Sequence, residues 1–327
     1  MPRLQSQISS AHNLGARSAL IKTHAVRLGF HKVGIVPAAT LSEEHERLKE
    51  WLSRGFHGEM KWMARDPEQR TNPQKLFSDA RSVIVVALNY STAHEHSDNP
   101  GKVSRYAWGD DYHEVVGDKL RQLLSWIEEQ WPEVKGKVCV DIQATMDKAW
   151  AARAGIGWIG KHTNLITEEY GSWIFIGELL LNVELEYDQT ETADQCGACT
   201  LCIEACPTGA ITEAYVLDSN LCISHATIES RAPAIKDDVA GKLEGWLYGC
   251  DICQDVCPWN QMTPVTDEPR FEPRQGNINV SLSQIIELTA ETYAERFRHS
   301  AMKRAKLSGL QRNARALLDA GSADLAR

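Results

Sequence analysis

Eight of the nine cysteines stand in two groups of four, and their spacing constrains the fold more than any other feature. The first group spells C-x2-C-x2-C-x3-C-P, with Cys196, Cys199, Cys202 and Cys206. The second group ends in the same C-x2-C-x3-C-P pattern, with Cys222, Cys250, Cys253 and Cys257. Its first cysteine is displaced, because 27 residues separate Cys222 from Cys250. Three thiols on one tight loop can bind three corners of a compact metal cluster, so the fourth ligand must come from elsewhere.

The first run is the pattern of bacterial two-cluster ferredoxins, in which the fourth cysteine binds the cluster opposite its own run. We therefore predict two [4Fe–4S] clusters in a ferredoxin-like domain. Cluster 1 is assigned Cys196, Cys199, Cys202 and Cys257. Cluster 2 is assigned Cys206, Cys222, Cys250 and Cys253. Crossing the fourth ligands holds the two clusters close enough for electron transfer.

Two alternative roles for these cysteines are zinc binding and disulfide formation. Zinc sites usually pair two C-x2-C hooks and do not use a triple run. Disulfides are rare in the cytoplasm, where we place the chain because its N-terminus lacks the apolar core of a signal peptide. No apolar run approaches the roughly 20 residues of a membrane span, so no membrane partner is expected. Cys139 lies within an apolar segment and is interpreted as a core residue.

Charge is unevenly distributed along the 327 residues, whose net charge is −9. The segment 296–315 holds seven basic and no acidic residues: Arg296, Arg298, Lys303, Arg304, Lys306, Arg312 and Arg315. A basic segment on an acidic protein indicates a local anionic partner, although a solvated helix face is an equally simple explanation.

Helical and strand-like segments alternate through the first half of the chain. Helices are predicted at 18–28, 43–53, 114–130 and 146–154, and strands at 32–36, 82–90, 137–142, 163–167 and 173–183. This alternation predicts an α/β domain over 17–190, after a flexible N-terminal tail over 1–16. The cysteine domain follows over 191–265, and a helical segment over 266–327.

Several stretches resemble one family, the epoxyqueuosine reductases. They are SRYAWGDDYH (104–113), VD (140–141), ARAGIGWIGKHTNLI (152–166), GSWIFIGELL (171–180), LCISHATIE (221–229), GCDICQDVCPWN (249–260) and SGLQRNARALL (308–318), together with the first cysteine run. The resemblance extends from about residue 17 to the end. It implies a cobalamin-binding domain related to reductive dehalogenases, a two-cluster domain and a HEAT-like C-terminal segment.

The resemblance also implies a reaction. Epoxyqueuosine at the tRNA wobble position is reduced to queuosine, with electrons from an external donor passing through both clusters to base-off cobalamin. Two alternatives stay open: another corrinoid reductase of the dehalogenase kind, or a non-enzymatic iron–sulfur electron carrier or cluster-assembly factor. A monomer is expected.

Asp141 matches the proton donor of the family. It ends a strand-like run, where active-site groups of α/β domains tend to lie, and we expect partial burial to raise the pKa of its carboxyl. The competing interpretation is an aspartate that caps the next turn. Asp147 is the rival acid, but its place at a helix start favours a structural role. Where the family commonly has a proline behind the aspartate, this chain has Ile142-Gln143-Ala144-Thr145.

The resemblance implies corrin contacts on several loops. They are Trp62, Met63, Arg105, Asp141, His162, Thr163, Leu165, Ile176, Ser224, Cys250 and Asp251. A corrin needs apolar packing on its faces and short polar partners at its edge. For Trp62, Met63 and Ile176, ordinary core packing is nearly as good an explanation. The tRNA contacts implied are Arg231, Lys303, Arg304, Arg312 and Arg315.

Overall fold

The computed structural model describes residues 2–141, 143–188, 192–274 and 276–324. Its centre is a four-stranded sheet in the order β1-β2-β7-β4, formed by β1 (Lys32–Pro37), β2 (Ser82–Asn89), β7 (Ile174–Leu181) and β4 (Gly136–Cys139). All three strand pairs are antiparallel. The alternation of helices and strands correctly predicted these strands, but the sheet is of the α+β kind and lacks the parallel pairing of an α/β fold. The predicted strand at 163–167 shortens to β6 (Leu165–Ile166), which pairs with β5 (Trp158–Ile159) outside this sheet.

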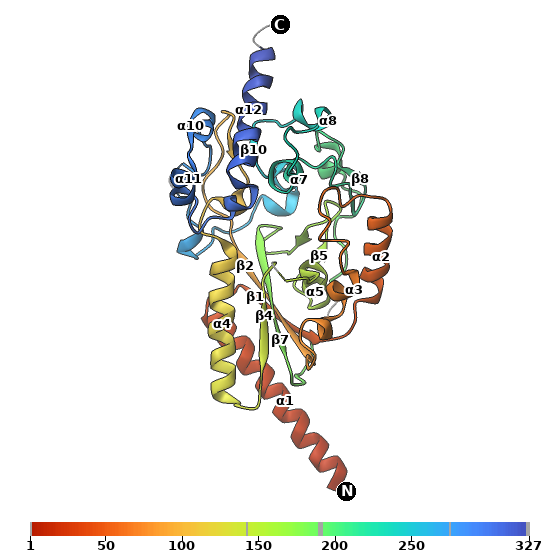
Figure 1. Ribbon diagram of the computed structural model, residues 1–327. Coiled ribbons are helices and arrows are strands. Elements are labelled where there is room, and N and C mark those ends of the chain that lie inside the picture. Colours follow the sequence, from red (N-terminus) through yellow and green to blue (C-terminus); the bar gives the residue numbers. More distant parts are fainter. Residues whose placement is uncertain (1, 142, 189–191, 275, 325–327) are drawn as a thin grey trace.

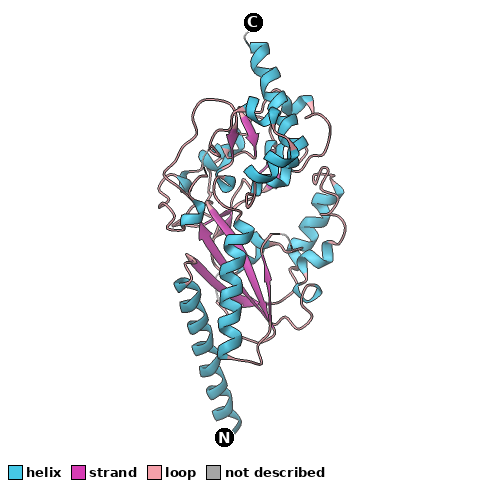
Figure 2. Cartoon of the chain, turned by 60° about the vertical axis from the view of Figure 1, so that its left-hand side comes forward, coloured by secondary structure: helices cyan, strands magenta, loops and turns pink. Residues whose placement is uncertain are grey.

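Both faces of the sheet are covered, which explains why β2 is apolar from Val83 to Leu88 and buried at every position. The helices α1 (Pro2–Arg27) and α4 (Tyr112–Gln130) lie on one face, as Figures 1 and 2 show. The short helix α5 (Asp147–Arg153) lies on the other face, against β2 and β7. Ile84, Val86 and Leu88 point toward α1 and α4, whereas Val83, Val85 and Ala87 point toward α5.

The predicted flexible tail at 1–16 differs from the structure, in which residues 2–16 form the first turns of α1. The helix predicted from Ser18 therefore begins at Pro2. Proline is favoured in the first turn of a helix, and the helix continues to Arg27 before Gly29 adopts a positive φ of 94°. In Figure 1, α1 projects from the body of the molecule toward the N-terminus.

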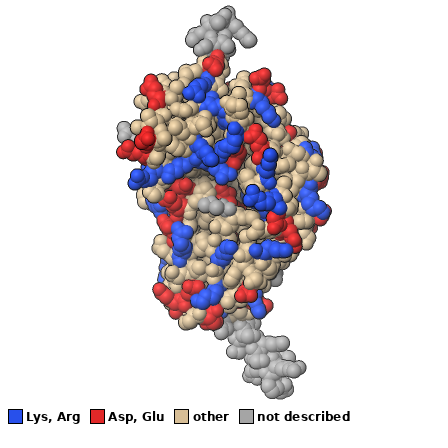
Figure 3. Space-filling view, viewed as in Figure 1, with Lys and Arg blue, Asp and Glu red and all other residues tan. Residues whose placement is uncertain are grey.

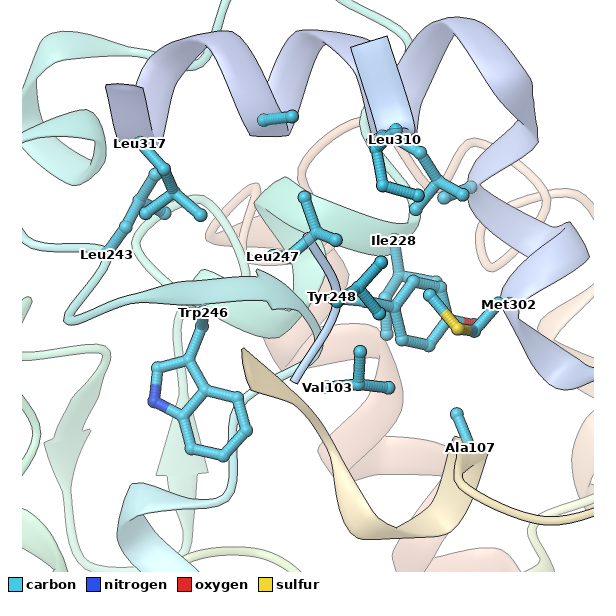
Figure 4. Packing of buried hydrophobic residues seen from close by; sticks show 14 of the residues in the cluster. Val103, Ala107, Ile228, Leu243, Trp246, Leu247, Tyr248, Met302, Leu310 and Leu317 are labelled. Atoms are coloured by element: carbon cyan, nitrogen blue, oxygen red, sulfur yellow. The ribbon is translucent and has the colours of Figure 1, made fainter. Parts of the chain in front are cut away.

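A second hydrophobic core lies beyond the edge of the sheet. It joins the insertion between Cys222 and Cys250 to the C-terminal helices, around Tyr248, Leu247, Met302 and Leu310 (Figure 4). Its elements are β3 (Lys102–Val103), η2 (Arg105–Ala107), α7 (Ile223–Ile228), α8 (Asp237–Ala240), β10 (Trp246–Tyr248), α10 (Leu282–Glu287), α11 (Ala290–Arg296), η5 (Ala301–Ala305) and α12 (Lys306–Asp324). The predicted boundary at 265/266 is therefore not a boundary between cores. The HEAT-like character of these helices stays a prediction.

The cysteine runs each enter a single short helix, α6 (Leu201–Glu204) and α9 (Ile252–Asp255), and these two helices contact each other. The remaining elements are α2 (Ser42–Ser53), α3 (Pro67–Thr71), η1 (Pro73–Lys75), β8 (Ile211–Glu213), β9 (Val216–Leu217), η3 (Pro258–Asn260) and η4 (Pro269–Phe271). Among the helices of the described ranges, none has the length and apolar character that crossing a membrane requires.

Candidate active site

The four cysteines assigned to cluster 1 surround a cavity of about 270 Å³. Its lining includes Cys196, Cys199, Cys202 and Cys257, with His162 and Trp259 beside them. The thiol of Cys257 interacts with those of Cys196, Cys199 and Cys202, the set predicted for cluster 1. The fourth cysteine of the second run therefore faces the first run, as the crossover requires.

The four cysteines assigned to cluster 2 form a second site, which we call the second cysteine group: Cys206, Cys222, Cys250 and Cys253. The Cys253 thiol interacts with those of Cys222 and Cys206, and the Cys250 thiol interacts with those of Cys253 and Cys222. Burial raises the pKa of the Cys222, Cys250 and Cys253 thiols. Such buried thiols become thiolates when a metal centre supplies the opposing positive charge.

Asp141 follows β4 with a positive φ of 52°, and its side chain is 58% exposed. Two neighbours from the start of α4 hold its carboxylate: the Tyr112 hydroxyl donates a hydrogen bond to it, and His113 Nε2 lies 3.3 Å from Oδ2. Desolvation raises the pKa of the Asp141 carboxyl, but these hydrogen bonds outweigh it and lower the pKa below its ordinary value. The expectation of a raised pKa at Asp141 was therefore wrong.

His113 was missed at the level of the sequence, although it ends the quoted motif SRYAWGDDYH. Its Nδ1 lies 2.6 Å from Oδ1 of Asp111, the residue that caps α4. Desolvation lowers the pKa of His113, but hydrogen bonds and charge interactions with Asp111 and Asp141 raise it from 6.5 to about 9. His113 therefore contributes stability that is fully present below pH 6.5 and is lost as the pH rises through about 9.

A carboxyl with a raised pKa close to Asp141 is that of Asp147, the first residue of α5. Burial and the nearby charge of Asp141 raise the pKa of Asp147 to about 6, and they raise that of the fully buried Glu178 further. Within the described part of the chain, neither carboxylate oxygen of Glu178 accepts a hydrogen bond from a donor. Glu178 nevertheless lies within hydrogen-bonding reach of the Asp147 carboxyl. A proton shared by the two satisfies both groups. The interpretation of Asp147 as a purely structural residue is therefore too narrow.

Lys148 connects the Asp141 region to the second cysteine group. Its side chain is classed as exposed, and desolvation lowers its pKa. Its ammonium interacts with Asp141, Asp147, Cys222 and Cys253, and donates to the carbonyl of Thr163 at 3.0 Å. Asp141 and the second cysteine group therefore border the same region.

Several predicted corrin contacts surround this region. Thr163 has a positive φ of 66°, Leu165 is buried, and Ile176 packs beside it on the α5 side of the sheet. His162 is 3% exposed, and its Nε2 has no hydrogen-bond partner. Burial and Lys148 lower the pKa of His162 to about 4, so the ring is neutral. An unpartnered buried ring nitrogen suits a site that a ligand with an amide fringe completes.

The remaining contacts fall into three groups. Ser224 lies in α7, two residues after Cys222, and is half-buried. The Asp251 carboxylate is buried and accepts from the Ser104 hydroxyl and from the backbone N–H of Arg105 at 2.8 Å. These two hydrogen bonds hold η2 to the start of α9, and the role of Asp251 as a corrin contact stays a prediction.

The third group of predicted corrin contacts consists of Arg105, Trp62 and Met63. The Arg105 guanidinium donates to the His94 carbonyl and lies 3.5 Å from Asp255. Trp62 is 40% exposed, and the guanidinium carbons of Arg70 and Arg304 lie 4.9 Å and 5.9 Å from its ring centroid. Met63 is half-buried. Trp62 is therefore not a core residue. Its ring lies against Arg304, whose charge also acts on Asp141.

The predicted tRNA contacts divide into exposed and buried residues. Lys303, Arg304, Arg315 and Arg231 are exposed, and Figure 3 shows basic side chains gathered across the middle of one face. Arg304 pairs with Glu229 at 2.7 Å, and Arg231 donates to the Arg304 carbonyl. Arg312, in contrast, is 8% exposed and donates to backbone carbonyls of Ala226, Ser230 and Ala232. The prediction that Arg312 contacts tRNA is therefore wrong, because its guanidinium fastens α12 to the end of α7.

Replacing Arg312 with Ala is expected to destabilise the fold by about 2–4 kcal/mol, because three backbone carbonyls and Asn313 lose their donor. Replacing the exposed Arg315 on the same helix should leave stability within about 0.5 kcal/mol and weaken tRNA binding modestly. Denaturant unfolding and filter binding at two salt concentrations measure the two effects. Equal loss of stability in both variants would contradict this assignment.

Comparison with known proteins agrees with this geometry. The family model "Epoxyqueuosine reductase QueG, DUF1730" matches residues 70–142, and the "4Fe-4S double cluster binding domain" matches residues 195–260. An epoxyqueuosine reductase of Synechocystis is 46% identical over 88% of this chain and 100% of its own length. One of Gloeobacter violaceus is 43% identical over 95% of this chain and 98% of its own.

A solved structure is also similar: the crystal structure of an epoxyqueuosine reductase with an epoxyqueuosine-modified tRNA-Tyr stem loop. It superposes with a TM-score of 0.86 at 31% identity, covering 93% of this chain and 81% of that one. Fold, cysteine domain and relatives together define an iron–sulfur oxidoreductase. The chain belongs to the epoxyqueuosine reductase family.

Proposed function

We propose that this chain reduces epoxyqueuosine to queuosine in tRNA, with electrons passing through two [4Fe–4S] clusters to base-off cobalamin and with Asp141 as the proton donor. The observation that carries the proposal is that Lys148 interacts both with Asp141 and with Cys222 and Cys253 of the second cysteine group. The family also supports a cytoplasmic location, where tRNA and reduced thiols occur.

The residues around Asp141 fit a corrin. His162 offers an unpartnered buried nitrogen, Leu165 and Ile176 offer apolar surface, and Thr163 and Ser224 offer short polar groups. When bound, cobalamin supplies a strongly reducing metal centre. The protein supplies orientation, exclusion of water, and a proton for the oxygen that leaves the epoxide.

Exposed basic side chains support tRNA as the substrate carrier. Lys303, Arg304 and Arg315 are exposed on η5 and α12, and the charge of Arg304 acts on Asp141. RNA phosphates bound there bring an anticodon loop to the acid, because phosphate contacts position the nucleic acid.

The test is conversion of epoxyqueuosine to queuosine in tRNA from cells that lack this gene, followed by nucleoside analysis. Anaerobic, cluster-loaded protein should convert the tRNA only when cobalamin and a low-potential reductant are both present. Turnover of a haloaromatic with no activity on tRNA would favour the dehalogenase alternative. Cobalamin spectra that do not change on titration with the protein would favour the electron-carrier alternative.

A further inference from the structure

The imidazole of His113 lies between two carboxylates. Its Nδ1 is 2.6 Å from Asp111 Oδ1, and its Nε2 is 3.3 Å from Asp141 Oδ2. A neutral imidazole has one N–H and can donate to only one of these oxygens, whereas the imidazolium donates to both. The geometry therefore calls for one proton at Nδ1 and one between Nε2 and Asp141.

Other charged and titratable groups surround Asp111, His113 and Asp141. The groups that interact with Asp141 are Tyr112, Tyr106, Arg304, Arg70, Lys148, Asp147 and Glu178, and those that interact with Asp111 are Lys303 and Tyr248. The pKa of Asp141 is lowered and that of His113 is raised to about 9. Near neutral pH the proton is therefore on the ring and not on the catalytic carboxyl.

The reaction needs more protons than Asp141 holds. Converting an epoxide to an alkene takes up two electrons and two protons, breaks both C–O bonds and releases one water. An external one-electron donor supplies the electrons in the proposed function. An ionised Asp141 has no proton to give until it receives one.

We propose that His113 is the proton store of this site, and that its Nε2 proton passes to Asp141, which delivers it to the epoxide oxygen as a C–O bond breaks. Asp111 holds the Nδ1 proton and keeps Nε2 directed at Asp141. The transfer occurs twice in each turnover, and solvent restores the proton because the His113 side chain is 24% exposed. Asp141 is the catalytic residue; His113 and Asp111 are positioning residues that act through it. This inference rests on the proposed function.

The first test is His113→Gln, whose amide can still donate a hydrogen bond to Asp141 but cannot release a proton. Single-turnover reduction of a modified anticodon stem loop should slow by about 10²-fold. The wild-type rate should be level below pH 9 and fall above it, as His113 loses its proton. The variant rate should instead rise as the pH is lowered toward the pKa of Asp141. A wild-type rate and pH profile in the variant would overturn the inference.

The matched control is His299→Gln. His299 also pairs with a carboxylate on α4, because its Nδ1 lies 2.8 Å from Glu114, and among the described residues its ring bonds to Glu114 and not to Asp141. This variant should retain the wild-type rate and pH profile. An equal loss in both variants would indicate a general disturbance of α4 and would also overturn the inference.

The second test needs no reduction of tRNA. Magnetic resonance titration of isotope-labelled histidine in cluster-loaded, cobalamin-free protein should show a His113 midpoint near 9, identified by its loss in His113→Gln. Asp111→Asn should move the midpoint down by at least about one unit, since an acceptor charge is lost. A wild-type midpoint near 6.5 would overturn the inference. Wild-type protein that does not reduce tRNA would overturn the proposed function instead, so the two failures are distinguishable.

Discussion

Asp141→Asn is expected to slow the reduction of epoxyqueuosine by about 10²- to 10⁴-fold, the usual effect of removing a general acid. An amide has nearly the shape of the carboxyl and can still accept a hydrogen bond from Tyr112, but it cannot pass on a proton. Binding of the stem loop and of cobalamin should therefore stay near wild type. Single-turnover nucleoside analysis measures the rate, and spectral titration measures cobalamin binding.

Asp79→Asn, an exposed aspartate on the loop before β2, is the control for Asp141→Asn and should behave as wild type. Activity of Asp141→Asn within about twofold of wild type would remove Asp141 from the acid role. The buried pair of Asp147 and Glu178 would then be the next candidate, because both carboxyls have raised pKa values.

Cys257→Ala is expected to abolish reduction, because it removes the fourth ligand of cluster 1 and breaks the electron path. The crossed assignment makes a sharper prediction for double variants. Cys196 and Cys257 belong to one predicted cluster, so replacing both should lose one cluster and about half of the iron. Cys222 and Cys257 belong to different clusters, so replacing both should lose both. Iron analysis and electron paramagnetic resonance of the reduced protein distinguish these outcomes.

Cys139→Ala is the matched control for the cysteine variants. Cys139 is buried in β4, opposite Glu178, and belongs to neither group. This variant should keep both clusters. If the double variant of Cys196 and Cys257 lost both clusters, the ligands would follow the runs without crossing.

The cysteine groups were predictable because their chemistry depends on local spacing. Three cysteines within seven residues can bind three corners of one cluster. The repeated run then implies that the fourth cysteine of each run binds the other cluster. The strands were also predictable, since an apolar run such as Ser82–Asn89 suits a strand covered on both faces. Strand pairing was not, because hydrophobicity does not determine whether neighbours run parallel or antiparallel.

The charged residues show where local inference fails. Arg312 and Arg315 are three residues apart in one basic segment, yet one is buried against carbonyls of α7 and the other is exposed. Asp141 was selected by its motif, but the direction of its pKa shift depends on Tyr112 and His113, which are 28 or more residues away in the chain.

By itself the sequence determined the two cysteine sets, the family and the identity of the candidate acid, because spacing and motif order are properties of the chain. Only the tertiary structure decided which groups hold protons. The pKa of a side chain depends on burial and on charges within a few ångströms, and folding brings Asp111, His113 and Asp141 together from two separate segments. For the same reason, only the structure showed that Lys148 interacts both with Asp141 and with Cys222 and Cys253.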